Sequence, residues 1–154
     1  MAYIKFLESK DIEYLREHHT LGRRADSVDT LLDFPFISKI HAVIEWREPN
    51  WLIKDVSRNG VWLNQQRLSP QVRTILKKND IVKIAGEDGI HFQIENTESP
   101  KNMVYQCENK IVSIDLDSGC LIPNDDTPEF GIYHCPDRAQ WFAESITTLS
   151  LIHI

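Results

Sequence analysis

The chain has 154 residues, of which 42% are hydrophobic and 26% are charged, and its formal net charge is −6. No apolar run reaches the roughly 18 residues of a membrane span, and the N-terminal sequence MAYIKFLESKD lacks the hydrophobic region of a secretory signal. The three cysteines, Cys107, Cys120 and Cys135, are an odd number and do not suggest a disulfide framework. We therefore expect a cytoplasmic protein that does not use a membrane as its partner.

The charge is distributed unevenly along the chain. Met1–Asn96 contains 14 Lys and Arg against 14 Asp and Glu, whereas Thr97–Ile154 contains 3 against 9. A nucleic-acid-binding domain usually has a basic surplus, so nucleic acid is not the expected partner. The change of charge, together with the polar stretch Asn96–Pro100, predicts a boundary that divides the chain into domains 1–96 and 97–154.

Short strand-like runs fill the first domain. Turn residues such as Asn59-Gly60 and Asp88-Gly89 separate them, and no segment has a convincing helical period. This pattern predicts an all-β, antiparallel sandwich or barrel. The expected strands are Tyr3–Leu7, Tyr14–His18, Val28–Asp33, His41–Trp46, Trp51–Val56, Val61–Asn64, Val72–Leu76, Ile81–Ala85 and Ile90–Glu95.

The strands His41–Trp46 and Trp51–Val56 enclose a turn-forming sequence, Arg47-Glu48-Pro49-Asn50. If the turn is centred between Glu48 and Pro49, the numbers of paired residues sum to about 97 in an antiparallel ladder. The segments around Ser38-Lys39 and Arg58-Asn59 then emerge side by side at the far end of the hairpin. Two cations, a hydroxyl and an amide at one sheet end predict an anion site.

The second domain is less regular. The sequence NKIVSIDLDSGCLI resembles a hairpin that turns at Asp117-Ser118-Gly119, and GIYHC resembles one more strand. Asp137 with Gln140 forms a capping-box pattern, and the apolar residues that follow predict a helix near 137–149. The hydrophobic end LSLIHI indicates either a buried terminus or a fragment of a longer protein.

Two kinds of catalytic or metal site are disfavoured by spacing. Ser38 and His41 are three residues apart, so on a strand their side chains point to opposite faces and do not form a nucleophile–base pair. The cysteines lack a Cys-x-x-Cys pair, so we expect no metal and no cofactor. A nonenzymatic binding module is the expectation.

Three short motifs together resemble the forkhead-associated (FHA) domain. They are Gly22-Arg23, Ser38-x-x-His41 and the run from Asp55 to Asn64, DVSRNGVWLN. The resemblance covers about residues 2–96 and implies an antiparallel β-sandwich of about eleven strands, followed here by a small C-terminal β/α extension. It further implies that loops at one end of the sandwich bind phosphothreonine in a partner protein.

The resemblance assigns roles residue by residue. Arg23 and Ser38 would hold the phosphate, Lys39 and Arg58 would add positive charge, and Asn59 would hydrogen-bond the peptide backbone. In the family, threonine is preferred to serine because a small pocket receives its methyl group. The residues expected to shape the site are Gly22, His41, Gly60 and Asn64.

The sequence departs from the family pattern at three positions. Arg58 stands where a small hydroxyl residue is frequent, Val61 where threonine is usual, and Gln65 where glycine is frequent. These differences affect loop shape and therefore peptide preference. The function expected is phosphothreonine-peptide recognition in signalling or assembly. The alternatives are a phosphate-independent oligomerisation module that uses the C-terminal segment, and the regulatory part of a larger enzyme or transcription factor.

Overall fold

The computed structural model describes residues 1–104, 113–114, 119–122, 126–146 and 151–153. All regular structure in these residues is β-strand. Within the same residues, no helix is long and apolar enough to cross a membrane. The chain forms two compact units, Met1–Pro100 and Lys101–Ile154, each of which is described by itself.

The N-terminal unit contains eleven strands among its described residues. The strands expected from His41–Trp46 onward are present with small shifts of their ends, but the strand Gln66–Arg67 was not predicted. The segment 12–22 forms two short strands separated by a bend rather than the single strand expected at Tyr14–His18. The strands are β1 (Tyr3–Phe6), β2 (Ile12–Tyr14), β3 (His18–Gly22), β4 (Thr30–Leu31), β5 (Ala42–Arg47), β6 (Asn50–Asp55), β7 (Val61–Leu63), β8 (Gln66–Arg67), β9 (Arg73–Leu76), β10 (Ile81–Ile84) and β11 (Ile90–Asn96).

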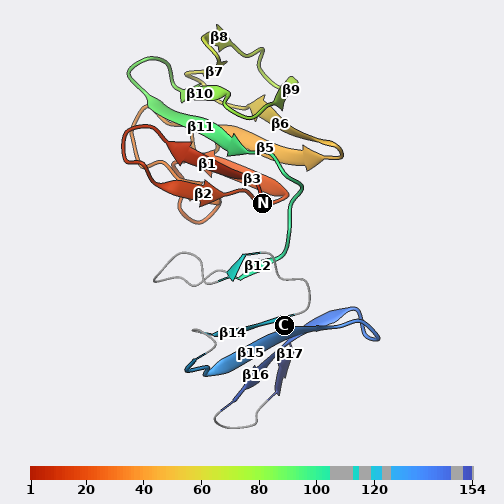
Figure 1. Ribbon diagram of the computed structural model, residues 1–154. Coiled ribbons are helices and arrows are strands. Elements are labelled where there is room, and N and C mark those ends of the chain that lie inside the picture. The colour runs from red at the N-terminus through yellow and green to blue at the C-terminus, as the bar shows by residue number, and fades with distance from the viewer. Residues whose placement is uncertain (105–112, 115–118, 123–125, 147–150, 154) are drawn as a thin grey trace. The chain divides into compact units, whose positions relative to one another are not determined.

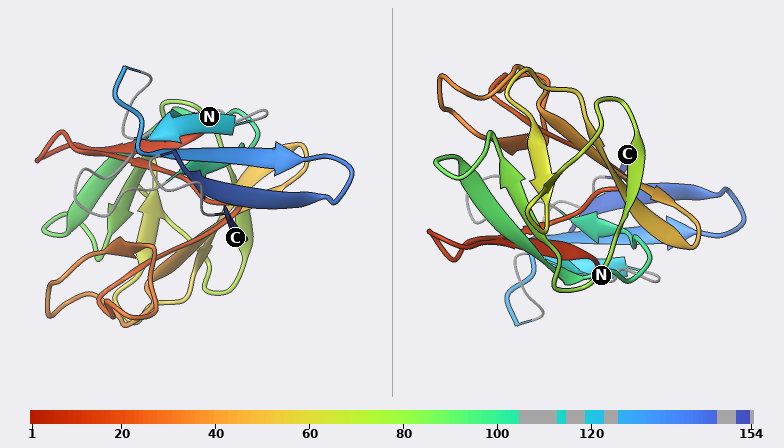
Figure 2. Two further views of the ribbon diagram at one scale, coloured as in Figure 1. Left: turned by 90° about the horizontal axis from the view of Figure 1, so that it is seen from below. Right: turned by 90° about the horizontal axis from the view of Figure 1, so that it is seen from above.

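These strands form two sheets that face each other as a sandwich (Figures 1 and 2). The six-stranded sheet has the order β2-β1-β11-β10-β7-β8, and the five-stranded sheet has the order β4-β3-β5-β6-β9. The pairs are antiparallel except for β3 and β4, which run parallel where Leu21 pairs with Thr30. The predicted all-β sandwich is therefore confirmed.

Alternation along the strands creates the core between the sheets. In β6, Trp51 and Ile53 are buried while Leu52 and Lys54 are not, because successive side chains point to opposite faces of a sheet. The facing sheet contributes residues of the same kind, such as Phe92 and Ile94 of β11. This continuous core fixes the frame from which the loops project.

The hairpin of β5 and β6 has the predicted register. Ala42 pairs with Asp55 and Trp46 with Trp51, so each pair of residue numbers sums to 97. The turn lies at Glu48-Pro49. Because this register is fixed by the turn, the residues before Ala42 and those after Asp55 meet at the opposite end of the hairpin.

The C-terminal unit differs from the prediction. Its described strands are β12 (Met103–Val104), β13 (Ser113–Ile114), β14 (Gly119–Ile122), β15 (Phe130–Cys135), β16 (Gln140–Ser145) and β17 (Leu151–His153). The last four form an antiparallel sheet in the order β14-β15-β16-β17. The strand expected at GIYHC is present as part of β15.

The helix predicted near 137–149 is wrong, because its centre is strand β16. Trp141 pairs with His134, and Phe142 pairs with Tyr133. Hydrogen bonds from the N–H groups of Arg138 and Ala139 close the turn that joins β15 to β16. Cross-strand pairing thus overrides the local capping pattern, and the β/α extension is a β-sheet in its described residues.

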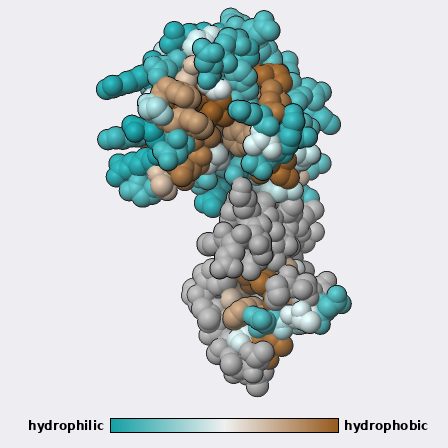
Figure 3. All heavy atoms as spheres, turned by 90° about the vertical axis from the view of Figure 1, so that its left-hand side faces the viewer, coloured by the Kyte–Doolittle hydropathy of each residue, from teal (hydrophilic) through white to brown (hydrophobic). Residues whose placement is uncertain are grey.

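Some sequence predictions fall outside the described residues. These are Cys107, the turn positions Asp117 and Ser118, residues 147–149 of the expected helix, and residues 149, 150 and 154 of the hydrophobic end. The hairpin expected from NKIVSIDLDSGCLI is wrong in its described strands, because β13 pairs with β12 and β14 pairs with β15. Cys120 and Cys135 are half-buried. Hydrophobic residues reach the surface of each unit, as the space-filling view shows (Figure 3).

Candidate functional site

Three chain segments converge at one end of the five-stranded sheet. Because β5 is antiparallel to both β3 and β6, the end of β3, the start of β5 and the end of β6 lie at the same edge. The loops that leave these points carry Gly22-Arg23, residues 35–40 and residues 56–60. The topology therefore brings the three sequence motifs together.

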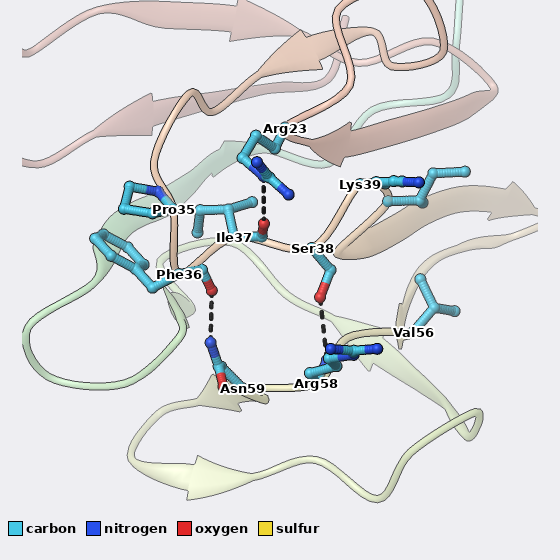
Figure 4. Close-up of a pocket in the computed structure, with 10 residues that line it drawn as sticks. Arg23, Pro35, Phe36, Ile37, Ser38, Lys39, Val56, Arg58 and Asn59 are labelled. Atoms are coloured by element: carbon cyan, nitrogen blue, oxygen red, sulfur yellow. Dashed lines mark hydrogen bonds between the residues drawn. The ribbon is translucent and has the colours of Figure 1, made fainter.

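These loops enclose an open pocket of about 480 Å³. Figure 4 shows Ser38 between Arg23 on one side and Arg58 with Asn59 on the other. All five residues predicted to bind the ligand line this pocket, together with apolar residues that were not predicted. The lining residues are Arg23, Pro35, Phe36, Ile37, Ser38, Lys39, Ile40, Val56, Arg58 and Asn59.

Arg23 is exposed but held in place by the loop that it faces. Its backbone N–H donates to the carbonyl of Ser38 over 3.0 Å, and its Nε–H donates to the carbonyl of Ile37 over 3.1 Å. Because the Nε hydrogen bond uses one of five guanidinium donors, the two terminal amino groups remain for a ligand. A planar pair of donors suits the oxygens of a phosphate.

Ser38 connects the two loops through its hydroxyl. The backbone N–H of Arg58 donates to Ser38 Oγ over 3.1 Å (Figure 4). A hydroxyl that accepts one hydrogen bond keeps its own proton as a donor. Ser38 is therefore positioned by Arg58 and still able to donate to an anion.

Asn59 is anchored in the same manner. Its Nδ2 donates to the carbonyl of Phe36 over 2.7 Å. This contact leaves Oδ1 as an acceptor and the second amide hydrogen as a donor. One side chain can thus bond both the N–H and the C=O of an extended peptide backbone.

His41 braces the Ser38 loop from inside the protein. Its ring is buried, its Nδ1 accepts the backbone N–H of Ser38 over 3.1 Å, and its Nε2 lies 3.0 Å from the carbonyl of Gly60. These partners require a neutral ring with its proton on Nε2. Burial lowers the pKa of His41, which favours that neutral form. The ring bonds the backbone of Ser38 and not its hydroxyl, so the geometry does not provide a nucleophile–base pair.

A second buried histidine uses the same arrangement. His19 Nδ1 accepts the N–H of Arg16, three residues earlier, and Nε2 lies 2.8 Å from Thr30 Oγ1. Burial lowers the pKa of His19 to about 4. Each ring therefore hydrogen-bonds the loop that precedes its strand and holds that loop against the sheet. His19 does so at the start of β3 and His41 at the start of β5.

The glycines of the site allow close backbone contacts. A Cβ on Gly22 would lie 2.2 Å from the carbonyl oxygen of Lys39, so a larger residue would displace that loop. Gly60 has φ +92°, a conformation that side chains disfavour. Its N–H donates a hydrogen bond to Ser57 Oγ, and the Ser57 hydroxyl donates to the carboxylate of buried Asp55.

Asp55 and Ser57 were not predicted as site residues. The Asp55 carboxylate accepts hydrogen bonds from the N–H and the hydroxyl of Ser57, over 2.8 and 2.6 Å. This fixes the turn that presents Arg58 and Asn59. The sequence Asp-x-Ser before Asn-Gly was the available signal, because both side chains bond nearby backbone readily.

Asn64 does not reach the pocket. Strand β7 separates it from Gly60, and its side chain bonds Asp80 and the N–H of Ile81 at the start of β10. It has φ 46°, in the left-handed region that asparagine tolerates. In this structure Asn64 supports a distant turn of the sandwich.

A second, smaller cavity adjoins the first. It has a volume of about 270 Å³ and is lined by Arg23, Arg24, Asp33 and Lys39. Arg24 is paired with Asp26 over 2.8 Å. Among the described residues, Lys39 and Arg58 have no carboxylate within ion-pair distance. The site therefore has unneutralised positive charge directed to solvent.

Comparisons with known proteins identify one domain family. The family model of the FHA domain matches residues 19–85. Bovine E3 ubiquitin-protein ligase RNF8 is 36% identical over 77 residues, which are 46% of this chain and 16% of that protein. The protein Germ layers disorganized gldi-3 of Caenorhabditis elegans is 36% identical over 62 residues, 38% of this chain and 6% of that protein. The chain thus spans a small part of these relatives.

Solved structures show the same fold. Mycobacterium tuberculosis EmbR in complex with a low-affinity phosphopeptide has a TM-score of 0.57 at 26% identity, covering 66% of this chain and 26% of that one. The N-terminal FHA domain of S. cerevisiae Rad53p with a phosphothreonine peptide has a TM-score of 0.55 at 22% identity, covering 64% of this chain and 93% of that one. Residues 19–85 of this chain thus match the FHA domain family, and the N-terminal unit has the fold of the solved Rad53p FHA domain.

Proposed function

We propose that this chain binds phosphothreonine in partner proteins and thereby assembles proteins in response to a kinase. The observation that carries the proposal is the convergence of Arg23, Ser38 and Asn59 on one open pocket. Each side chain is held by one hydrogen bond and keeps further donors available. A phosphate near pH 7 carries a charge of about −1.5 to −2 and three acceptor oxygens. Fixed, charge-assisted donors therefore distinguish it from an unmodified hydroxyl.

Lys39 and Arg58 add positive charge on the two loops that enclose the phosphate position. Both side chains are exposed and unpaired among the described residues, so they increase the attraction for a dianion with little rearrangement. Arg58 replaces a hydroxyl by a cation, and the structure gives it a second role through its backbone N–H to Ser38.

The apolar wall of the pocket supports threonine as the modified residue. Ile37 and Val56 line the same cavity as Arg23 and Ser38, and Phe36 lies beside Asn59. A methyl group that leaves water against such a wall contributes about 0.8 kcal/mol. The additional methyl of phosphothreonine relative to phosphoserine is therefore a favourable contact.

Peptide orientation comes from Asn59, and no chemical step is required. Asn59 has one acceptor and one donor beyond its bond to Phe36, which match a peptide backbone. The His41 ring is buried and bonds the backbone N–H of Ser38, so it is not placed to activate the Ser38 hydroxyl. The proposed function is thus recognition without catalysis.

Calorimetric titration with a phosphothreonine peptide and its unphosphorylated form tests the proposal. Arg23→Ala should weaken binding of the phosphorylated peptide by about 2–5 kcal/mol, because it removes the paired guanidinium donors. Arg47→Ala is the matched control, since Arg47 is an exposed cation at the other end of strand β5. Equal affinity for the two peptides, or equal losses in the two variants, contradicts the proposal.

A further inference from the structure

Among the residues that the structure describes, one threonine is exposed to solvent. Among the described residues, Thr30 is buried, Thr20, Thr74 and Thr97 are partly buried, and Thr127 is exposed. Thr20 and Thr30 also bond neighbouring side chains inside the sandwich. Thr127 is therefore the described threonine that a modifying enzyme and a binding domain can both reach.

The loop that carries Thr127 is anchored close by. The N–H of Glu129 donates to the carbonyl of Ile122 over 2.7 Å, and the N–H of Ile146 donates to the carbonyl of Glu129 over 2.9 Å. Thr127 lies two residues before this anchor. Pro128 follows it directly, which disfavours a helical conformation at Thr127. The backbone bends at Asp126 and Thr127, before strand β15 begins at Phe130.

Charge complementarity connects this loop to the FHA pocket. Exposed Asp126 precedes Thr127, exposed Glu129 follows it by two residues, and the chain from Thr97 onward holds the entire net charge of −6. The cavity next to the phosphate position is lined by Arg23, Lys39, Asp33 and Arg24, and Arg24 is paired with Asp26, so the two remaining cations exceed the one carboxylate. An acidic residue beside a phosphothreonine fits that surplus of positive charge.

We propose that Thr127 is a phosphorylation site and that phosphorylated Thr127 binds the FHA pocket of a second copy of this chain. This inference rests on the proposed function and names the ligand. A protein kinase that accepts proline after the target joins Thr127 Oγ1 to the γ-phosphorus of ATP. The bond to ADP breaks, and the hydroxyl proton passes to the kinase's catalytic base. Phosphorylation then assembles copies of the chain.

A donor and an acceptor variant of the full chain test this proposal. The donor carries phosphothreonine incorporated at position 127 together with Arg23→Ala, so its own pocket does not compete. The acceptor carries Thr127→Val and an intact pocket. Sedimentation should show a donor–acceptor complex whose affinity is at least tenfold higher than that of the same donor without phosphate. Adding Arg23→Ala to the acceptor should abolish the gain, and Asp126→Asn in the donor should reduce it.

The outcomes separate the two proposals. An acceptor that binds an unrelated phosphothreonine peptide but not the phosphorylated donor overturns the assignment of Thr127 and leaves the proposed function intact. An acceptor that binds no phosphothreonine peptide overturns both. A complex that persists after phosphatase treatment also contradicts the inference, because association then does not depend on the phosphate.

Discussion

The two units of the chain reach their folds with very different cores. In Met1–Pro100, both sheets contribute buried side chains such as Trp51 and Phe92 to one continuous cluster. Among the described residues of Lys101–Ile154, Phe142 is the one buried hydrophobic residue, and Leu121, Phe130 and Tyr133 of the same unit are exposed. The N-terminal unit thus has a core of its own, and the described part of the C-terminal unit has only a small one.

The difference explains where a preorganised site is found. The loops around Arg23, Ser38 and Asn59 leave strands whose inner faces are buried, and hydrogen bonds to buried His41 and Asp55 hold them. A site positioned in this way loses little entropy when a ligand binds. In the C-terminal unit, exposed Thr127 suits the role of ligand that we propose for it.

The largest expected difference between the units concerns their cores. Trp51→Ala should lower the free energy of unfolding of the N-terminal unit by about 3–5 kcal/mol, since it opens a cavity at a side chain that is 1% exposed. Phe142→Ala should leave that transition unchanged. Urea denaturation followed by fluorescence measures both. A loss below about 1 kcal/mol for Trp51→Ala contradicts the core as described.

A pH dependence should follow from the two buried histidines of the N-terminal unit. The pKa of His19 falls from its ordinary 6.5 to about 4, and burial also lowers that of His41. Below pH 6.5 the unfolded chain therefore binds protons that the folded chain does not. The free energy of unfolding should fall as the pH is lowered from 6.5 towards 4, with His19 contributing about 3 kcal/mol. The carboxyl groups of Asp29 and Glu45, whose pKa values are also lowered, should extend this fall to lower pH.

Unfolding measured at a series of pH values checks this prediction without any ligand, whose phosphate also titrates near pH 6. His19→Gln is the control, because glutamine keeps an amide donor and does not titrate. The variant should lose the His19 share of the pH dependence. A free energy of unfolding that stays constant between pH 7 and pH 4.5 is incompatible with neutral, buried rings.

Alanine substitution of one glycine in each unit compares how much space the backbone leaves for a side chain. Gly22→Ala should cost about 1–3 kcal/mol and abolish phosphopeptide binding, because the new Cβ would lie 2.2 Å from the Lys39 carbonyl and displace the Ser38 loop. Gly131→Ala should change stability by less than about 0.5 kcal/mol, since its Cβ would lie 3.7 Å from Leu121 at ordinary contact. Thermal unfolding and peptide titration measure the pair. Normal peptide affinity in Gly22→Ala would show that the loop tolerates the displacement.

The smallest effect is expected from removing residues 101–154. Every residue of the N-terminal core cluster lies between Ala2 and Ile94. Residues 1–100 alone should therefore unfold cooperatively and bind a phosphothreonine peptide with the affinity of the full chain. Differential scanning calorimetry and titration compare the two. Loss of the cooperative transition on truncation would show that the core needs the C-terminal unit.

Much of the N-terminal fold could be predicted because local signals agree there. Alternating apolar residues on both sides of Glu48-Pro49 predicted the β5–β6 register. That register correctly placed the segments of Ser38-Lys39 and Arg58-Asn59 side by side. The contrast with Asp137–Gln140 is instructive. That pattern caps a helix in isolation, but pairing of Trp141 with His134 depends on a strand that a local window does not include.

The sequence predicted the polar residues that line the candidate pocket and missed the apolar residues that line it. Arg23, Ser38 and Asn59 stand out because their residue types bind phosphate and peptide backbone. Phe36 and Val56 line the same pocket. The sequence alone does not distinguish an apolar residue that lines a pocket from one in the hydrophobic core. Asn64 was expected to support the site because of its place in the motif. Its side chain instead bonds Asp80 and the N–H of Ile81, which the motif does not indicate.

An amide NMR titration of the full chain with a phosphothreonine peptide tests the central claim most directly. We predict that the signals of Arg23, Ser38 and Asn59 shift together and saturate at one peptide concentration, while Arg47 at the opposite end of the sheet does not respond. The unphosphorylated peptide should produce no such shifts. Responses centred on the Glu48-Pro49 turn, or the same shifts with both peptides, would contradict phosphate recognition at this pocket.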